Sequence, residues 1–135
     1  MKRVRVVVTG LGVVSSIGIG WRAFWEALLA GRSGIKRIQY LDASKYPTQY
    51  GGEVGDFDPL QFIPPRAAIR MGRGTQFAVA ATKMALEDAQ LFAEELEETR
   101  VGVCLGTTMA DIQALEAANQ TWVQSGEGAI PSSLV

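Results

Sequence analysis

The sequence predicts an α/β protein, because strand-like and helix-like patterns alternate along its 135 residues. Residues 4–8 are a short run rich in β-branched residues, typical of a strand covered on both faces, and residues 101–106 indicate a second buried strand. Helical patterns stand between these two runs and again after the second. This order favours a parallel sheet with helical crossovers. Two strands are too few for such a sheet, so we expect residues 1–135 to form part of a larger fold.

The first strand runs into a glycine-rich bend at residues 10–20, and a helix is expected over residues 21–30. Gly31 stands where the C-terminal cap of this helix belongs. Three large apolar residues recur on one helical face and are joined by Phe24; they are Trp21, Trp25 and Leu28.

The middle of the chain, residues 32–65, is expected to be mostly irregular, with a short strand within residues 49–54. A double proline then introduces a helical stretch that is interrupted near Gly72 and Gly74. The helix resumes over residues 75–91, where small side chains permit close approach of another backbone; these are Ala78, Ala80 and Ala81. A last helix follows the 101–106 strand and ends near Gln124.

Composition excludes several classes of function. The chain has a net charge of -1, so it lacks the excess positive charge that is typical of a nucleic-acid-binding protein. No apolar run approaches the roughly 18 residues that cross a bilayer, and no convincing leader peptide is present, so we expect a cytoplasmic protein. The chain has no histidine, which removes the commonest general base and metal ligand.

Two motifs invite a chemical interpretation that we do not favour. Gly10 and Gly12 after a strand resemble part of a dinucleotide-binding loop, but Ser15 replaces the third glycine, and a tight bend is the better interpretation. Cys104 lies between Val103 and Leu105, so we expect a buried core residue rather than a nucleophile.

Three arginines follow the double proline at positions i, i+4 and i+7, a spacing that places them on one helical face. They are Arg66, Arg70 and Arg73. Either they form a solvated edge, or they form a cationic patch for an acidic partner. Composition alone leaves both interpretations open.

Taken in order, several segments resemble the N-terminus of the β-ketoacyl-acyl carrier protein synthases, the condensing enzymes of the thiolase superfamily, and most closely the elongating type. The segments are residues 6–15 with Gly18, residues 25–35, residues 76–78, residues 85–89 and residues 100–106. The match covers essentially the whole chain. Each motif is weak alone, and the set is specific.

The resemblance implies an α/β, thiolase-like fold of two related halves, of which residues 1–135 are the N-terminal part of the first. It also implies a dimer that condenses an acyl thioester with malonyl-acyl carrier protein by decarboxylation, without a metal or cofactor. The family's nucleophilic cysteine and two histidines follow later in the chain. We therefore expect no catalytic residue within 1–135 and no condensing activity from this segment alone.

The resemblance carries over some binding roles. Met109 matches an apolar residue that gates the acyl pocket, and Ser132 and Ser133 stand where relatives have aromatics that close it from the neighbouring subunit. Arg66 and Arg70 match positions that dock the acidic carrier protein, whereas Ile69 replaces a third basic residue. Two other hypotheses stay open: a catalytically inactive chain-length-type partner subunit of the same fold, and an unrelated nucleotide-binding or scaffold domain.

Overall fold

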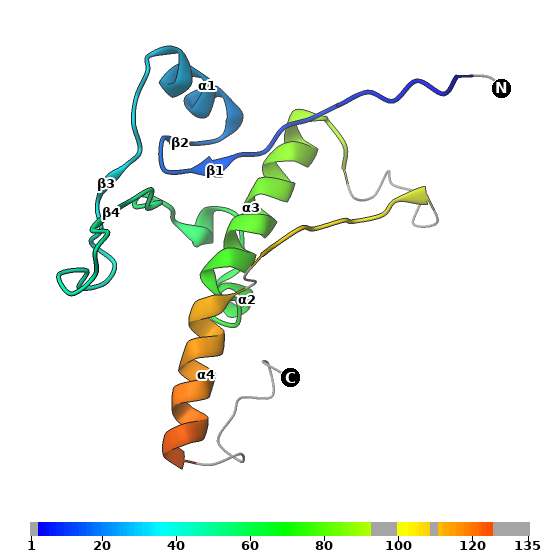
Figure 1. The fold of residues 1–135 in the computed structure, drawn as a ribbon. Coiled ribbons are helices and arrows are strands. Elements are labelled where there is room, and N and C mark those ends of the chain that lie inside the picture. The colour runs from blue at the N-terminus through cyan, green and yellow to red at the C-terminus, as the bar shows by residue number, and fades with distance from the viewer. Residues whose placement is uncertain (1–2, 93–99, 109–110, 126–135) are drawn as a thin grey trace.

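The computed structural model describes residues 3–92, 100–108 and 111–125 (Figure 1). Helix α3 occupies the middle of the molecule. The N-terminal segment and α1 lie toward one end of α3, the short helix α2 lies at the other end, and α4 continues beyond α2. The elements, in chain order, are β1 (Val14–Ser15), β2 (Gly18–Ile19), α1 (Trp21–Leu29), β3 (Lys36–Arg37), β4 (Tyr50–Gly51), the 3-10 helix η1 (Pro59–Gln61), α2 (Pro65–Ala68), α3 (Arg73–Asp88) and α4 (Ile112–Ser125).

The two strands predicted at residues 4–8 and 101–106 do not form in the described part of the chain. Both segments are extended traces without a ladder partner (Figure 1), and their side chains are exposed, with Val4 at 87% and Val103 at 88%. A strand satisfies its backbone N–H and C=O groups only through a neighbouring strand, and none lies beside these segments among the described residues. The predicted parallel sheet is therefore not seen.

The strands that do form are two small antiparallel ribbons, and of their four strands the sequence analysis predicted only β4. β1 pairs with β2 through Val14↔Ile19 and Ser15↔Gly18, and the Ser15 hydroxyl donates a 2.9 Å hydrogen bond to the Gly18 carbonyl across the turn. β4 falls within the short strand expected at residues 49–54, and its partner β3 lies in the segment expected to be irregular.

Helix α1 confirms the predicted helix and its cap. Gly31 has φ +63°. Two backbone hydrogen bonds close the C-terminal end of α1: the Gly31 N–H donates to the Leu28 carbonyl at 3.0 Å, and the Arg32 N–H donates to the Ala27 carbonyl at 2.9 Å. This is the Schellman pattern, which requires the left-handed conformation that glycine adopts without strain. The predicted tryptophan face is only partly covered, with Trp25 and Leu28 exposed and Ala27 buried.

The glycine-rich bend packs against α3, as expected for a close backbone approach. Side chains on Gly10 and Gly12 would collide with the backbone of α3 at Ala81 and Ala85, so only glycine fits there. Asp88 of α3 fixes the same contact by accepting hydrogen bonds from the Leu11 backbone N–H and the Trp21 indole, at 3.0 and 2.8 Å. The sequence analysis gave Asp88 no role.

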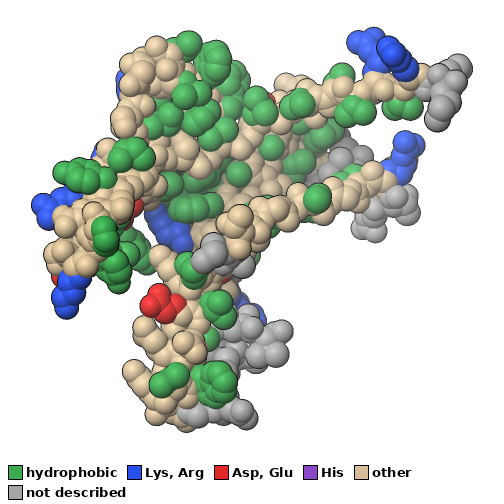
Figure 2. Space-filling view, in the orientation of Figure 1, with side chains coloured by type: hydrophobic (Ala, Val, Ile, Leu, Met, Phe, Trp, Pro, Cys, Tyr) green, Lys and Arg blue, Asp and Glu red, His purple; other side chains and the backbone are tan. Residues whose placement is uncertain are grey.

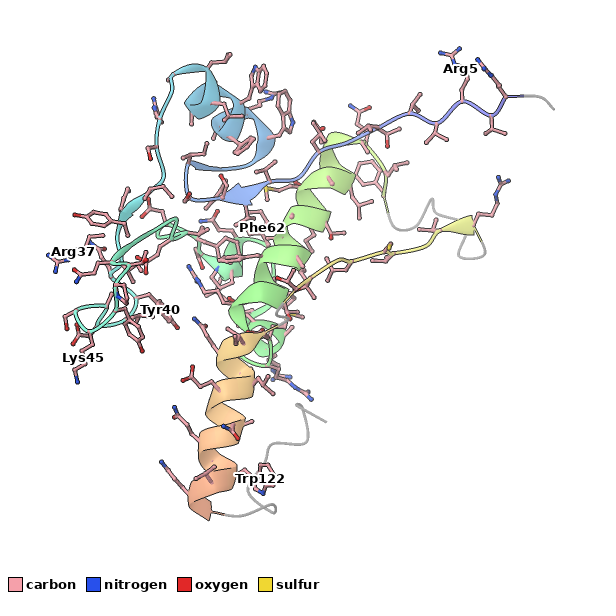
Figure 3. The ribbon with its side chains drawn as sticks, in the orientation of Figure 1. Arg5, Arg37, Tyr40, Lys45, Phe62 and Trp122 are labelled. Carbon is pink, nitrogen blue, oxygen red and sulfur yellow. The ribbon has the colours of Figure 1, made fainter. Side chains whose placement is uncertain are left out.

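The core of the described residues is small, and much apolar surface is exposed. Figure 2 shows hydrophobic side chains along both extended segments. Arg5 and Trp122 project away from the body of the molecule (Figure 3). Among the helices of the described ranges, none is long and apolar enough to cross a membrane. The buried apolar residues are Ala27, Ala43, Phe57, Ile63, Ala68 and Ala80.

Candidate functional site

The strongest candidate surface is the turn that joins α2 to α3, because it carries exposed cations. Arg66 lies in α2 and Arg70 follows its end, and both side chains are exposed. Ile69 between them is 86% exposed. Two guanidinium groups around a solvent-facing aliphatic side chain suit a partner that is acidic and also offers an apolar contact. We call Arg66, Ile69 and Arg70 the arginine surface.

The chain before α2 folds locally and directs this surface outward. The Asp58 carboxylate accepts a 2.9 Å hydrogen bond from the Leu60 N–H and so caps the 3-10 turn η1. Pro65 occupies the first turn of α2, where its missing N–H costs nothing. Ile63 is 2% exposed and Ala68 is 5% exposed, so one side of α2 is anchored in the core.

Gln76 of α3 locks the end of α2. Its side-chain amide donates hydrogen bonds to the carbonyls of Ala68 and Met71, at 3.0 and 3.1 Å. A four-residue helix has few internal hydrogen bonds, so these two side-chain bonds add to the single backbone bond from the Met71 N–H to the Ala68 carbonyl, at 3.2 Å. Gln76 therefore holds the backbone on both sides of Ile69 and Arg70. The sequence analysis placed Gln76 in a family motif but assigned it no function.

Arg73 does not belong to the arginine surface, and the prediction of three arginines on one helical face is wrong. Helix α2 ends at Ala68 and a new helix begins at Arg73, so the spacing does not continue through one helix. The Arg73 guanidinium instead lies over the rings of Phe57 and Phe77, at 5.6 and 5.0 Å from their centroids. It also donates a 2.7 Å hydrogen bond to the Val54 carbonyl.

This aromatic cluster fixes α3 against the segment that precedes α2. Phe57 stacks on Phe62 with 5.9 Å between centroids and meets Phe77 edge-on at 4.9 Å. Figure 3 shows Phe62 beside α3. Arg73 thus acts in packing, as a cation over aromatic faces.

The predicted acyl-pocket residues Met109 and Ser133, and Ser132 with them, lie outside the described residues. A cleft of about 640 Å³ lies between the β3–β4 ribbon and the starts of α3 and α4. Its polar lining includes Arg73, Asp111 and Gln113. The Tyr40 hydroxyl reaches Gln113 Oε1 at 3.4 Å across the cleft.

The prediction that Cys104 is a buried core residue is wrong for the described structure. The thiol is exposed, because the segment that carries it has no strand beside it. Within residues 3–92, 100–108 and 111–125, no group of three cysteine or acidic side chains is placed to hold a metal ion.

Comparison with known proteins agrees with this fold. The family model of the beta-ketoacyl synthase N-terminal domain matches residues 3–133. The chain is 42% identical over 116 residues to the 3-oxoacyl-acyl-carrier-protein synthase 2 of Synechocystis sp., covering 86% of this chain and 28% of that protein.

Two solved structures are also similar. The ishigamide ketosynthase/chain length factor superposes with a TM-score of 0.80 and 34% identity, covering 95% of this chain and 32% of the other. A type II polyketide synthase ketosynthase in complex with its acyl-carrier protein gives a TM-score of 0.73 and 26% identity, covering 96% and 32%.

The chain therefore spans about a third or less of the proteins that it matches. The α/β, thiolase-like fold that the sequence predicted is confirmed by these superpositions, although the described residues show only its helices and two short ribbons. The interpretation of the glycine-rich opening as a nucleotide-binding loop is not supported, since Gly10 and Gly12 pack on α3. The chain belongs to the beta-ketoacyl synthase family, with the match lying in the N-terminal domain.

Proposed function

We propose that this chain is the N-terminal part of a 3-oxoacyl-acyl carrier protein synthase. The complete enzyme condenses an acyl thioester with malonyl-acyl carrier protein in fatty-acid or polyketide synthesis. The family match over residues 3–133 carries this proposal. The nucleophile and the groups that stabilise the oxyanion belong to the rest of the enzyme, because residues 1–135 offer a single thiol and no imidazole.

The arginine surface is the proposed docking site for the acyl carrier protein. Arg66 and Arg70 are exposed, and the Gln76 amide holds the turn that carries Arg70. The solved complex of a similar ketosynthase with its acyl-carrier protein supports a carrier protein as the partner. Paired exposed charges mainly accelerate association with an acidic partner.

Met109 and Ser133 are the proposed substrate-binding residues of the acyl pocket. Methionine has an unbranched apolar side chain with several rotatable bonds, which suits a wall that adapts to an acyl chain. Ser133 and Ser132 are small and polar, so the pocket is less tightly closed than with aromatic residues. We further propose a cytoplasmic homodimer in which Ser133 of each subunit faces the pocket of its neighbour.

The proposal is tested with the complete synthase purified and supplied with acyl-acyl carrier protein and malonyl-acyl carrier protein. We expect release of carbon dioxide and formation of a 3-oxoacyl thioester two carbons longer than the primer. Absence of both products, with a correctly loaded carrier protein, would rule the enzyme out.

A second candidate is a catalytically inactive chain-length-type subunit that pairs with a true synthase. The chain is 34% identical to the ishigamide ketosynthase/chain length factor, and this similarity favours the second candidate as an alternative. Such a subunit would give no condensation alone and would restore it only when mixed with an active partner. The same assay, run with and without a partner synthase, separates the two candidates.

A further inference from the structure

The loop that joins β3 to β4, residues 38–49, and the strands beside it carry exposed aromatic and basic side chains. The loop lies at the edge of the molecule, away from α3 (Figure 1). Its large apolar side chains are 52–68% exposed. Arg37 and Lys45 reach outward on the side away from α3 (Figure 3). The set, which we call the basic-aromatic surface, is Lys36, Arg37, Tyr40, Leu41, Lys45, Tyr46 and Tyr50.

Positive charge is concentrated on this surface. Residues 36–50 contain three basic residues and one acidic residue, Asp42, whereas the whole chain has a net charge of -1. The Asp42 carboxylate is turned to the backbone of the loop itself and accepts a 3.0 Å hydrogen bond from the Ser44 N–H. The Arg37 guanidinium donates to a neutral acceptor, Gln49 Oε1, at 3.3 Å. The basic side chains therefore remain available to attract an anionic partner.

The backbone of the loop is held in place by hydrogen bonds. The Glu53 carboxylate accepts hydrogen bonds from the N–H groups of Gln39 and Tyr40, at 2.9 and 3.0 Å. Further along the loop, the Tyr46 N–H donates to the Ala43 carbonyl at 3.0 Å, and Ala43 is only 7% exposed. A partner therefore meets exposed side chains on an ordered backbone, which lowers the entropy cost of binding.

Two clefts flank the base of the loop, and the outer part of the loop is convex. The clefts have volumes of about 640 and 350 Å³, and residues 36–41 contribute to their lining. Residues 42–50 line neither of these two clefts. A convex surface offers no pocket to a peptide or a small ligand, whereas a bilayer surface needs no fitted cavity.

The composition of the surface points to the same kind of partner. Tyrosine has an apolar ring and a polar hydroxyl, and it is enriched where proteins meet the headgroup region of a membrane. Lysine and arginine are attracted to anionic lipid headgroups, and their aliphatic stems can stay among apolar groups. Shape and composition together favour an anionic lipid surface as the partner over an acidic protein.

We propose that the basic-aromatic surface binds the surface of an anionic membrane, with the chain lying on the bilayer and not crossing it. Arg37 and Lys45 contact the lipid headgroups, and the rings of Tyr46 and Tyr50 lie at headgroup depth. A single surface of this size gives weak, reversible binding. The proposal goes beyond the proposed function, because no step of the condensation involves this surface.

The test measures how the complete protein sediments with lipid vesicles. One set of vesicles contains equal parts of phosphatidylglycerol and phosphatidylcholine, and the other contains phosphatidylcholine alone. We expect binding to the anionic vesicles at low salt, weaker binding at high salt, and little binding to the neutral vesicles. Lys45→Gln should lower the partition coefficient about fivefold. Lys83→Gln, at an exposed lysine of α3, is the matched control and should bind like the wild type.

The tyrosines are tested separately from the charges. Tyr46→Ser with Tyr50→Ser keeps every cation, so it should weaken binding at both salt concentrations. Amide hydrogen exchange should slow in residues 42–50 when anionic vesicles are added, and it should not change in α1. The exchange measurement uses the wild type, so it decides the proposal even if a variant does not fold.

Equal binding to both kinds of vesicle, or equal loss in Lys45→Gln and Lys83→Gln, would overturn the proposal. A KM for acyl carrier protein that rises in Lys45→Gln, with vesicle binding unchanged, would assign the surface to an acidic protein and overturn it as well. Vesicle binding needs no catalysis. A complete protein that condenses no substrate but binds anionic vesicles through this loop would therefore refute the proposed function and support this proposal.

Discussion

The region around α2 buries apolar side chains, whereas the two extended segments at residues 4–8 and 101–105 leave theirs exposed. Around α2, Phe57, Ile63 and Ala68 are each no more than 5% exposed. At residues 4–8 and 101–105 the apolar side chains face solvent (Figure 2). The α2 region closes its hydrogen bonds within a short stretch of chain, through Asp58, Gln76 and helical carbonyls. The backbone N–H and C=O groups of a strand cannot be satisfied within the same short stretch of chain, because their hydrogen-bond partners lie on neighbouring strands.

The largest expected effect follows directly from that contrast. Residues 1–135 expressed alone should show no condensing activity and no sharp cooperative unfolding, because their extended apolar segments lack partners. Transfer of a radiolabelled acyl group from acyl carrier protein to the chain measures the first, and calorimetry with sedimentation measures the second. A thioester on Cys104, or a monomer with a sharp melt, would contradict the prediction.

The aromatic cluster tests whether the α2 region owes its order to local packing. Phe57→Ala in the complete synthase should destabilise this region by about 3–5 kcal/mol, because it removes the ring that both Phe62 and Phe77 contact. Amide hydrogen exchange in α2 and the first turns of α3 should become faster. Exchange in α1 should not change, since α1 is fixed to α3 through Asp88 at its other end.

A glycine pair tests the packing of the N-terminal segment on α3. Gly12→Ala should lower stability by about 1–3 kcal/mol, because the added methyl group collides with the α3 backbone at Ala81. Gly55→Ala is the matched control, since a Cβ there meets nothing within 4 Å. Thermal unfolding of both variants gives the comparison. Equal melting temperatures would mean that the bend and α3 are not in close contact.

Helices were easier to predict from the sequence than strands or site residues. The cap at Gly31 and the helical pattern of α3 depend on neighbours in sequence, and both were confirmed. The fate of residues 4–8 depends on which strand lies beside them, which no local pattern encodes. Arg73 was misassigned because its spacing from Arg66 ignored the helix break between α2 and α3. Gln76 bonds to carbonyls eight and five residues before it, separations that no helical or strand period predicts.

Charge reversal tests the arginine surface. Arg66→Glu with Arg70→Glu should raise the KM for acyl-acyl carrier protein several-fold at low salt, mainly through a slower association rate. Turnover of an acyl-pantetheine, which lacks the protein, should not change. Lys45→Glu with Lys83→Glu is the control, because it makes the same change of net charge at two other exposed lysines. Equal impairment with both substrates would make the arginines structural.

The smallest expected effect concerns Ile69. Substitutions there distinguish whether the arginine surface binds its partner through charge alone or through charge together with an apolar contact. Ile69→Lys adds a third exposed cation, so it should raise the association rate with acyl carrier protein at low salt by about twofold. At high salt the added charge is screened, and the loss of an apolar contact should leave binding slightly weaker than in the wild type. Stopped-flow association at two ionic strengths measures both. Ile69→Ala, which removes the side chain without adding charge, should weaken binding at both salt concentrations. If Ile69→Ala binds like the wild type, Ile69 makes no contact and the surface works through charge alone.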